Sequence, residues 1–344
     1  MVQPETICNS KTIFPKNFQK KKFLNRLATI QEDADEVQVP DASVMTSAMA
    51  TSRYFRKPTP LSNQGYTCYA SVILQALFAT WELWTQIPSE FSSNSPLLKS
   101  LVTCFTLMRS SIVRIEPKFF LSKLGSHISR TSKKSFKVNR PHDVPEVLSY
   151  ILNEIVMCPS LPPNLIRMNT LNSTSCCSCQ SSSEKEDTIL LLRLPTSSSV
   201  SFALRNMFSA RRLEENYSWF CETCGCSREA ICETSVKGSP QVLIVQLERF
   251  TQIGPSQIIR NNLIVSPEVN ITLSEPDGTK CKFQLVAEIH HSGSLDNGHY
   301  WALTLERSTK KWFLCDDQMV SETALKKSKT SYVLFYVLQS IGVE

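Results

Sequence analysis

Glycine and histidine are scarce in this chain, with nine glycines and five histidines among 344 residues. Long hydrophobic runs are missing too: no stretch approaches the roughly eighteen apolar residues that cross a bilayer, so no membrane contact is expected. The N-terminal segment carries no secretory signal, which disfavours persistent disulfides among the thirteen cysteines. We therefore expect an intracellular protein, cytoplasmic or nuclear, whose cysteines are free or bind metal.

A large excess of one charge sign is also missing, since the formal net charge is +6. Lysines cluster at residues 20–22 and again at Lys326, Lys327 and Lys329, but no aromatic stacking platform accompanies them. Such clusters are more often solvated surface than nucleic-acid sites, and no nucleic-acid partner is expected. With 42% hydrophobic residues, the chain can bury a large core in one elaborated domain with subdomains.

The first 57 residues differ from the rest of the chain. They combine a basic patch, an acidic patch and a stretch of small residues, with little periodicity. We expect a flexible N-terminal extension over residues 1–57, ahead of a catalytic domain over residues 58–340. Within the extension, Phe23, Leu24, Leu27 and Ile30 have the spacing of one short amphipathic helix.

Three of the nine glycines gather in two segments that also hold a cysteine and a histidine. Gly65 comes shortly before Cys68, while Gly293 and Gly298 come shortly before His299. Glycine is favoured where the backbone turns tightly or approaches a ligand closely. The two segments are therefore candidates for one functional site.

Cys68 is the candidate nucleophile. Residues 69–78 are mostly apolar and contain no Gly or Pro, which predicts a buried helix with Thr67 as its N-cap. The sulfur would then lie at the positive end of the helix dipole, where a thiolate is favoured. Taken alone, a cysteine is more often a small buried apolar residue, and a lone histidine in a strand is more often structural.

The C-terminal region predicts a hairpin that holds a base and an acid. Its strands are expected at residues 283–290, 299–305 and 311–316, around a polar turn at 307–310. Centring the turn between residues 307 and 308 pairs His299 with Asp316 and Leu303 with Trp312. Directly opposed side chains have Cβ atoms about 4.5–5.5 Å apart, so Asp316 could hold one tautomer of His299.

Several segments in order resemble the ubiquitin-specific protease family. Residues 63–69 (Asn-Gln-Gly-Tyr-Thr-Cys-Tyr) resemble its cysteine box, and residues 291–300 with 312–317 resemble its histidine box. Between them, residues 142–148 are similar to the family's Gln-Asp-Ala helix and residues 247–250 to its Leu-Lys-Arg-Phe strand end. The resemblance implies an α+β, papain-like cysteine protease fold with a helical thumb, a β-rich palm and zinc-binding fingers.

The resemblance also implies roles for single residues. Cys68 would be the nucleophile, His299 the base and Asp316 the group that orients the imidazole. Asn63 would donate to the oxyanion, and Asp317 would support the same site.

Two features depart from the family pattern or qualify it. The family usually has Asn-Ser three and four residues after the cysteine, where this chain has Ser71 and Val72. In the Gln-Asp-Ala-like segment, Pro145 would break a helix interior. Asp143 as N-cap with Glu146 at N3 predicts a capping box that leaves Pro145 in the first turn.

Two Cys-x-x-Cys pairs predict a metal site formed by Cys176, Cys179, Cys221 and Cys224. Cys177 and Cys226 leave the register open. The intervening chain must fold back, and it reads as a strand at 188–194, a helix at 199–208 and a return strand at 217–220. We expect a structural zinc and no organic cofactor, and the resemblance places this site in the fingers, at about residues 170–235.

The function that the resemblance implies is that of a thiol-dependent isopeptidase. It would cut after the C-terminal glycine of ubiquitin or a ubiquitin-like modifier, whose conjugates would be its partners. Two alternatives remain: a catalytically silent ubiquitin-binding scaffold of the same fold, and a papain-like peptidase for ordinary peptides. The second alternative gives the two cysteine pairs no task.

Overall fold

The computed structural model describes residues 57–343, apart from residue 64, residues 81–84, 86–94 and 111–113, residues 134 and 160, and residues 214–218, 255–256 and 295–296. The extension predicted over residues 1–57, with its short amphipathic helix, therefore lies outside the described residues except for Lys57. The catalytic domain predicted over residues 58–340 falls almost wholly within them.

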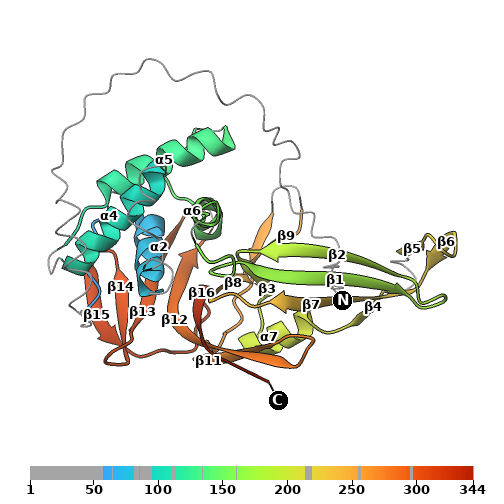
Figure 1. Ribbon diagram of the computed structural model, residues 1–344. Coiled ribbons are helices and arrows are strands. Elements are labelled where there is room, and N and C mark those ends of the chain that lie inside the picture. Colours follow the sequence, from blue (N-terminus) through green and yellow to red (C-terminus); the bar gives the residue numbers. More distant parts are fainter. Residues whose placement is uncertain are drawn as a thin grey trace. The chain divides into compact units, whose positions relative to one another are not determined.

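Four helices form the part that we call the thumb: α2 (Cys68–Ala79), α4 (Pro96–Ser110), α5 (Lys118–Ser132) and α6 (Val144–Val156). Figure 1 shows them together on one side of the main sheet. Helix α2 is the innermost helix because its sequence is apolar on all sides, and its first ten residues are buried. It contacts β13 more than any other strand, which fixes its N-terminus close to the C-terminal hairpin.

An eight-stranded sheet, which we call the palm, runs in the order β15-β14-β13-β12-β16-β8-β3, with β11 also paired to β12. Its strands are β3 (Leu192–Pro195), β8 (Val242–Glu248), β11 (Asn270–Ser274), β12 (Thr279–Gly293), β13 (Gly298–Glu306), β14 (Lys311–Asp316), β15 (Met319–Thr323) and β16 (Ser331–Val343). All described pairs are antiparallel except β3 with β8. The predicted α+β class is confirmed.

A second sheet, which we call the fingers, extends from the palm in Figure 1. It has the order β2-β1-β7-β4, and a separate ribbon pairs β5 with β6. The strands are β1 (Met168–Cys176), β2 (Ser182–Ile189), β4 (Arg211–Leu213), β5 (Trp219–Cys221), β6 (Cys226–Arg228) and β7 (Ala230–Gly238). A short ladder of β9 (Phe250–Gln252) with β10 (Ile258–Arg260) completes the described strands.

Two apolar cores hold the palm in place. The first lies between the thumb helices and one face of the sheet, where Tyr69 and Leu74 of α2 share a cluster with Ile289 and Phe335. The second lies on the other face and includes Leu243, Val245 and Tyr336, with α7 (Val200–Met207) packed against it. Burial on both faces explains the long apolar runs of β8 and β16.

The hairpin register differs from the predicted one by two residues. Leu305 pairs with Trp312 and Glu306 with Lys311, so the prediction that Leu303 pairs with Trp312 is wrong. The turn is centred between Ser308 and Thr309 because the Glu306 carboxylate accepts hydrogen bonds from both backbone N–H groups, at 3.0 and 2.7 Å. The loop itself, residues 307–310, is the one predicted, and only the position of its centre was wrong.

The segment between the cysteine pairs also differs in part. The helix predicted at 199–208 is present as α7, but the strand predicted at 188–194 is divided between the end of β2 and β3, which belong to different sheets. A return strand is present as β5, from Trp219, while residues 214–218 lie outside the described residues.

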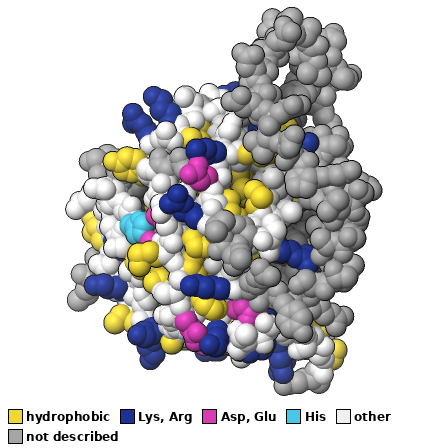
Figure 2. All heavy atoms as spheres, turned by 90° about the vertical axis from the view of Figure 1, so that its left-hand side faces the viewer, with side chains coloured by type: hydrophobic (Ala, Val, Ile, Leu, Met, Phe, Trp, Pro, Cys, Tyr) yellow, Lys and Arg dark blue, Asp and Glu magenta, His cyan; other side chains and the backbone are white. Residues whose placement is uncertain are grey.

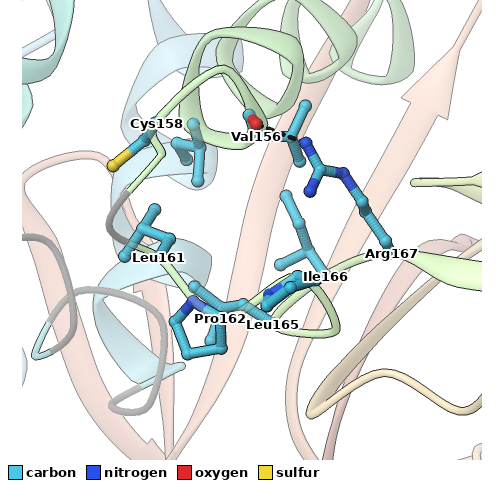
Figure 3. Close-up of a pocket in the computed structure, with 9 residues that line it drawn as sticks. Val156, Cys158, Leu161, Pro162, Leu165, Ile166 and Arg167 are labelled. Carbon is cyan, nitrogen blue, oxygen red and sulfur yellow. Dashed lines mark hydrogen bonds between the residues drawn. The ribbon is translucent and has the colours of Figure 1, made fainter.

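A small pocket lies where α6 leads into the fingers (Figure 3). Ile155, Leu161 and Pro162 line it, and the Arg167 guanidinium at its edge donates to the Val156 carbonyl. None of the predicted site residues lines this pocket. No helix in the described part of the chain is long and apolar enough to span a membrane.

Candidate active site

Cys68 is the first residue of α2 and is buried. The predicted N-cap position of Thr67 is right, but its side chain makes no capping hydrogen bond. Instead, the backbone N–H and hydroxyl of Thr67 both donate to Asn63 Oδ1, at 3.1 and 3.0 Å. The preceding loop turns sharply, since Gly65 and Tyr66 have φ values of 81° and 57°. The turn places the thiol at the N-terminus of the helix, where the dipole favours a thiolate.

His299 lies at the start of β13 and contacts both predicted partners. Its Nε2 is 2.6 Å from Asp316 Oδ1, which leaves the other ring nitrogen, Nδ1, for the thiol. Hydrogen bonding to Cys68, together with the Asp316 carboxylate, raises the pKa of His299 to about 9 although partial burial opposes the change. The imidazolium is therefore favoured at neutral pH, as an ion pair with a thiolate requires.

Asn63 is held at both ends of its amide. While Oδ1 accepts from Thr67, Nδ2 donates to Asp317 Oδ2 at 2.8 Å. The backbone carbonyl of Asp317 also accepts from the N–H of Leu61 at 3.0 Å, which ties this strand end to the segment before the nucleophile. Burial raises the pKa of Asp317. The structure thus places Asp317 against Asn63, while Asp316 contacts His299.

Asp143 departs from the predicted capping box. It occupies the N-cap position of α6 and Pro145 lies in the first turn, as expected, but no side-chain capping hydrogen bond forms. Its Oδ1 instead accepts from the hydroxyls of Tyr300 and Tyr332, at 3.1 and 3.0 Å. The capping prediction is wrong because the carboxylate of Asp143 accepts hydrogen bonds from two buried phenol hydroxyls in place of the backbone N–H groups at the start of α6.

Tyr300 and Tyr332 were not predicted as site residues. Tyr300 directly follows His299, and its bond to Asp143 ties the catalytic strand to α6. The sequence feature that could have identified them is a tyrosine within an apolar strand, because its buried hydroxyl needs a hydrogen-bond acceptor.

Gly298 makes the closest backbone approach in the site. A Cβ at this position would lie 2.1 Å from His291 Nε2 and 2.7 Å from the Ser292 carbonyl oxygen. His291 is 1% exposed and stacks on Tyr300 at 4.4 Å, and burial lowers its pKa to about 4. Glycine is therefore required beside His299, and His291 is a neutral packing partner.

The departure at Ser71 and Val72 leaves the nucleophile helix intact. Both residues are buried inside α2, which continues without interruption to Ala79. The Ser71 hydroxyl has no hydrogen-bond partner among the described residues.

The fingers bring together Cys176, Cys179, Cys221 and Cys224, whose sulfurs all lie within 4.8 Å of one another. The Cys179 and Cys221 sulfurs are 3.5 Å apart, close to the roughly 3.8 Å edge of a tetrahedron with metal–sulfur bonds of about 2.3 Å. The four cysteines can therefore hold a metal ion. Cys177 and Cys226 lie outside this group, so the structure selects one of the registers that the spacing left open.

Polar groups surround the cysteine cluster. The backbone N–H groups of Ser178 and Cys224 each donate to a cysteine sulfur at 3.4 Å. The Ser181 hydroxyl lies 3.1 Å from the Cys179 sulfur and 3.3 Å from the Cys221 sulfur. These donors favour the thiolate form that metal binding needs.

Two curated relatives of this chain are named as ubiquitin carboxyl-terminal hydrolases. "Ubiquitin carboxyl-terminal hydrolase 25" of Arabidopsis thaliana is 26% identical over 337 residues, which cover 86% of this chain and 49% of the relative. This chain thus spans about half of that relative's length. "Ubiquitin carboxyl-terminal hydrolase 12" of Salmo salar is 26% identical over 336 residues, which cover 80% of this chain and 88% of the relative.

A solved structure confirms the predicted fold. The chain matches the structure of the SAGA Ubp8/Sgf11/Sus1/Sgf73 DUB module bound to ubiquitin aldehyde, with a TM-score of 0.71 and 21% identity, over 87% of this chain and 74% of that chain. The sequence model of the family described as "Ubiquitin carboxyl-terminal hydrolase" matches residues 59–336. The chain belongs to the ubiquitin carboxyl-terminal hydrolase family, as its cysteine and histidine segments predicted.

Proposed function

We propose that this protein is a cysteine-type deubiquitinase. It hydrolyses the bond after the C-terminal glycine of ubiquitin or a ubiquitin-like modifier. The observation that carries the proposal is the convergence of Cys68, at a helix N-terminus, with His299 and its partner Asp316. Family membership over residues 59–336 supports the substrate class.

The reaction uses these groups in order. The Cys68 thiolate attacks the glycine carbonyl carbon while the lysine amine leaves and takes a proton from the His299 imidazolium. Water then attacks the thioester and gives one proton to the neutral imidazole. Cleavage of the C–S bond restores the thiolate and releases the modifier's carboxylic acid, which loses its remaining proton to solvent. Asp316 holds the Nε2–H throughout, so Nδ1 stays directed at the reacting atoms.

Asn63 is the side-chain donor for the oxyanion in this proposal. One Nδ2 hydrogen is engaged by Asp317, and the second remains to stabilise the negative charge that develops on the carbonyl oxygen. Asp317 and Thr67 fix the orientation of the amide before the substrate binds.

The cysteine cluster holds a structural zinc in this proposal. Four thiolates complete a tetrahedral shell, which leaves no open position for a water or a substrate. The ion would join the turn after β1 to the β5–β6 ribbon, so its contribution is to the shape of the fingers.

Ubiquitin or a ubiquitin-like modifier and its conjugates are the proposed partners, and an intracellular location is proposed with them. The structural relative carries ubiquitin aldehyde, which supports this choice. On the face shown in Figure 2, basic side chains are separated by hydrophobic and uncharged ones. That distribution supports a protein substrate over a nucleic acid, which needs a continuous basic surface.

A modifier that carries a C-terminal electrophile tests the proposal. The wild-type chain should form a covalent adduct with the ubiquitin probe, and the Cys68→Ala variant should form none while remaining folded. Probes built on other ubiquitin-like modifiers, used side by side, rank the modifier preference. A silent scaffold would bind ubiquitin without labelling, and an ordinary peptidase would cleave short unstructured peptides; either result overturns the proposal.

A further inference from the structure

A buried acid and a buried histidine lie beside the active site without a role in the proposed reaction. Glu288 and His290 of β12 are 0% and 4% exposed. Their closest contact joins His290 Nε2 to Glu288 Oε2 at 3.5 Å, and the Glu288 oxygens accept no hydrogen bond from any described residue. Removing a carboxylate from water costs more than one ordinary hydrogen bond returns. Such a pair therefore calls for a compensating role.

The surroundings of Glu288 supply charge but no hydrogen bond. The buried Arg249 side chain donates to the carbonyls of Asn261 and Leu263, each at 3.0 Å, rather than to Glu288. Burial lowers the pKa of Arg249 to about 10, and the nearby Glu288 carboxylate opposes this change. Glu288 thus has two basic residues nearby, Arg249 and His290, and of these two His290 lies opposite a residue of β13, the strand that carries His299.

His290 is fixed on both sides of its ring. Its Nδ1 lies 3.0 Å from the Thr330 hydroxyl. The ring itself stacks on Trp301, the residue directly opposite on β13, with centroids 5.4 Å apart and planes only 3° from parallel. The Thr330 hydroxyl therefore holds one edge of the imidazole, Glu288 lies at the other, and the face of the imidazole packs against the indole.

Trp301 in turn stacks beside His299, the partner of Asp316. It is two residues after His299 on the same face of β13, with ring centroids 6.2 Å apart and planes 27° from parallel. The pairing of β13 with β14 ends at Ala302 and Cys315, and Trp301 and Asp316 are the next residues of the two strands. The side chains of His299 and Asp316 are 47% and 36% exposed, so water competes for the hydrogen bond between them wherever the indole does not cover it.

We propose that Trp301 is a positioning residue for His299, held in place by the buried His290 and Glu288. Its indole limits rotation of the imidazole away from Asp316 and shields their hydrogen bond. The flat face of the indole also favours the imidazolium over the neutral ring. This inference rests on the proposed function, in which His299 is the base.

The test compares two tryptophans of one sheet. Trp301→Leu removes the indole, Trp301→Phe keeps an aromatic face, and Trp312→Leu is the matched control because Trp312 packs against the second core cluster. With a fluorogenic ubiquitin amide, Trp301→Leu should lower kcat by about 10-fold with KM within about two-fold, since a small misplacement of a catalytic group affects the chemical step. Trp301→Phe should recover most of the loss, and Trp312→Leu should stay near wild type.

A titration provides a readout that does not depend on turnover. The chain has only five histidines, so their ring resonances can be followed separately by NMR and His299 assigned with His299→Gln. Trp301→Leu should lower the pKa of His299 by about 0.5, the size expected when an exposed cation–π contact is lost. If Trp301→Leu does not fold, His290→Gln should give a smaller change in the same direction.

The outcomes separate the two proposals. An unchanged kcat and an unchanged His299 titration in folded Trp301→Leu would overturn the positioning role, as would an equal loss in Trp312→Leu. If the wild type neither labels nor turns over, the deubiquitinase proposal fails, while the His299 titration still decides the inference.

Discussion

Gly298 allows a sharp test of how tightly the strand that carries His299 is packed. In a Gly298→Ala variant, the new methyl carbon would lie 2.1 Å from His291 Nε2. Ordinary contact begins at about 3.4 Å, so one of the two groups must move by about 1.3 Å. His291 cannot move away easily, because its ring is buried and stacked on Tyr300. The Ser292 carbonyl, 2.7 Å from the same methyl, is part of β12.

The strain should therefore appear as a displacement of β13 at its first residues. Overpacking of this kind costs about 1–3 kcal/mol, which lowers the unfolding temperature by about 2–4 °C per kcal/mol in a domain of this size. His299 is the next residue and moves with the strand. A displacement near 1 Å can cost about 100-fold in rate, so kcat/KM should fall by about that factor, more than the loss of stability alone would produce.

Three measurements decide the outcome: the unfolding temperature, kcat/KM with a ubiquitin amide, and the rate of covalent capture. Gly342→Ala is the matched control, because nothing lies within 4 Å of a Cβ there. Adding His291→Ala to Gly298→Ala removes the nearest contact but not the one with Ser292, so recovery should be partial. A Gly298→Ala variant with wild-type stability and kcat/KM would refute the close-packing argument.

The other predictions concern the oxyanion donor, the thiol pair and the metal. Asn63→Ala should lower kcat about 10²–10³-fold. It should also lose about 1 kcal/mol of stability, because a half-buried amide that bonds at both ends is removed. A variant at the wild-type rate excludes the oxyanion role. Cys68→Ala should lower the pKa of His299 from about 9. In the wild type the folded pKa exceeds the unfolded value of about 6.5, so the free energy of unfolding should fall as pH rises from about 6.5 to about 9. Denaturant titrations across that pH range should show a smaller fall in Cys68→Ala. Elemental analysis should find one zinc per chain, which is retained in Cys177→Ser but lost in Cys221→Ser. Removal of the zinc by a chelator should lower the unfolding temperature. A folded wild-type protein that contains no zinc contradicts the metal assignment.

The helix of the nucleophile and the cysteine cluster could be predicted because local patterns determine them. An uninterrupted apolar run predicts the buried helix that begins at Cys68, and paired Cys-x-x-Cys spacing predicts converging sulfurs. The longest strands of the fingers were not predicted, since β2 is exposed along almost its whole length and consists mainly of Ser, Glu and Lys. Its pairing with β1 rests on backbone hydrogen bonds, which side-chain periodicity does not reveal.

The contacts of buried polar groups were the least predictable part of the site. Asp143 has the sequence of a helix cap, yet it serves Tyr300 and Tyr332, which are 157 and 189 residues away. Asp317 was expected only to support the same site, and the structure adds that its partner there is Asn63. In both cases the choice of partner depends on which donors the fold buries nearby, and that information is not local in the chain.

The hairpin shows why a wrong register still predicted the right pair. The actual pairing is shifted by two residues from the expected one, and side chains in a strand repeat with a period of two. Asp316 therefore keeps the same face and becomes a diagonal neighbour of His299, within reach of a long side chain. Across that diagonal, His299 Nε2 and Asp316 Oδ1 approach to 2.6 Å. A register shift of one residue would have moved Asp316 to the opposite face of the sheet. Any shift by an even number of residues leaves Asp316 and His299 on the same face, and the turn that Glu306 stabilises meets that condition.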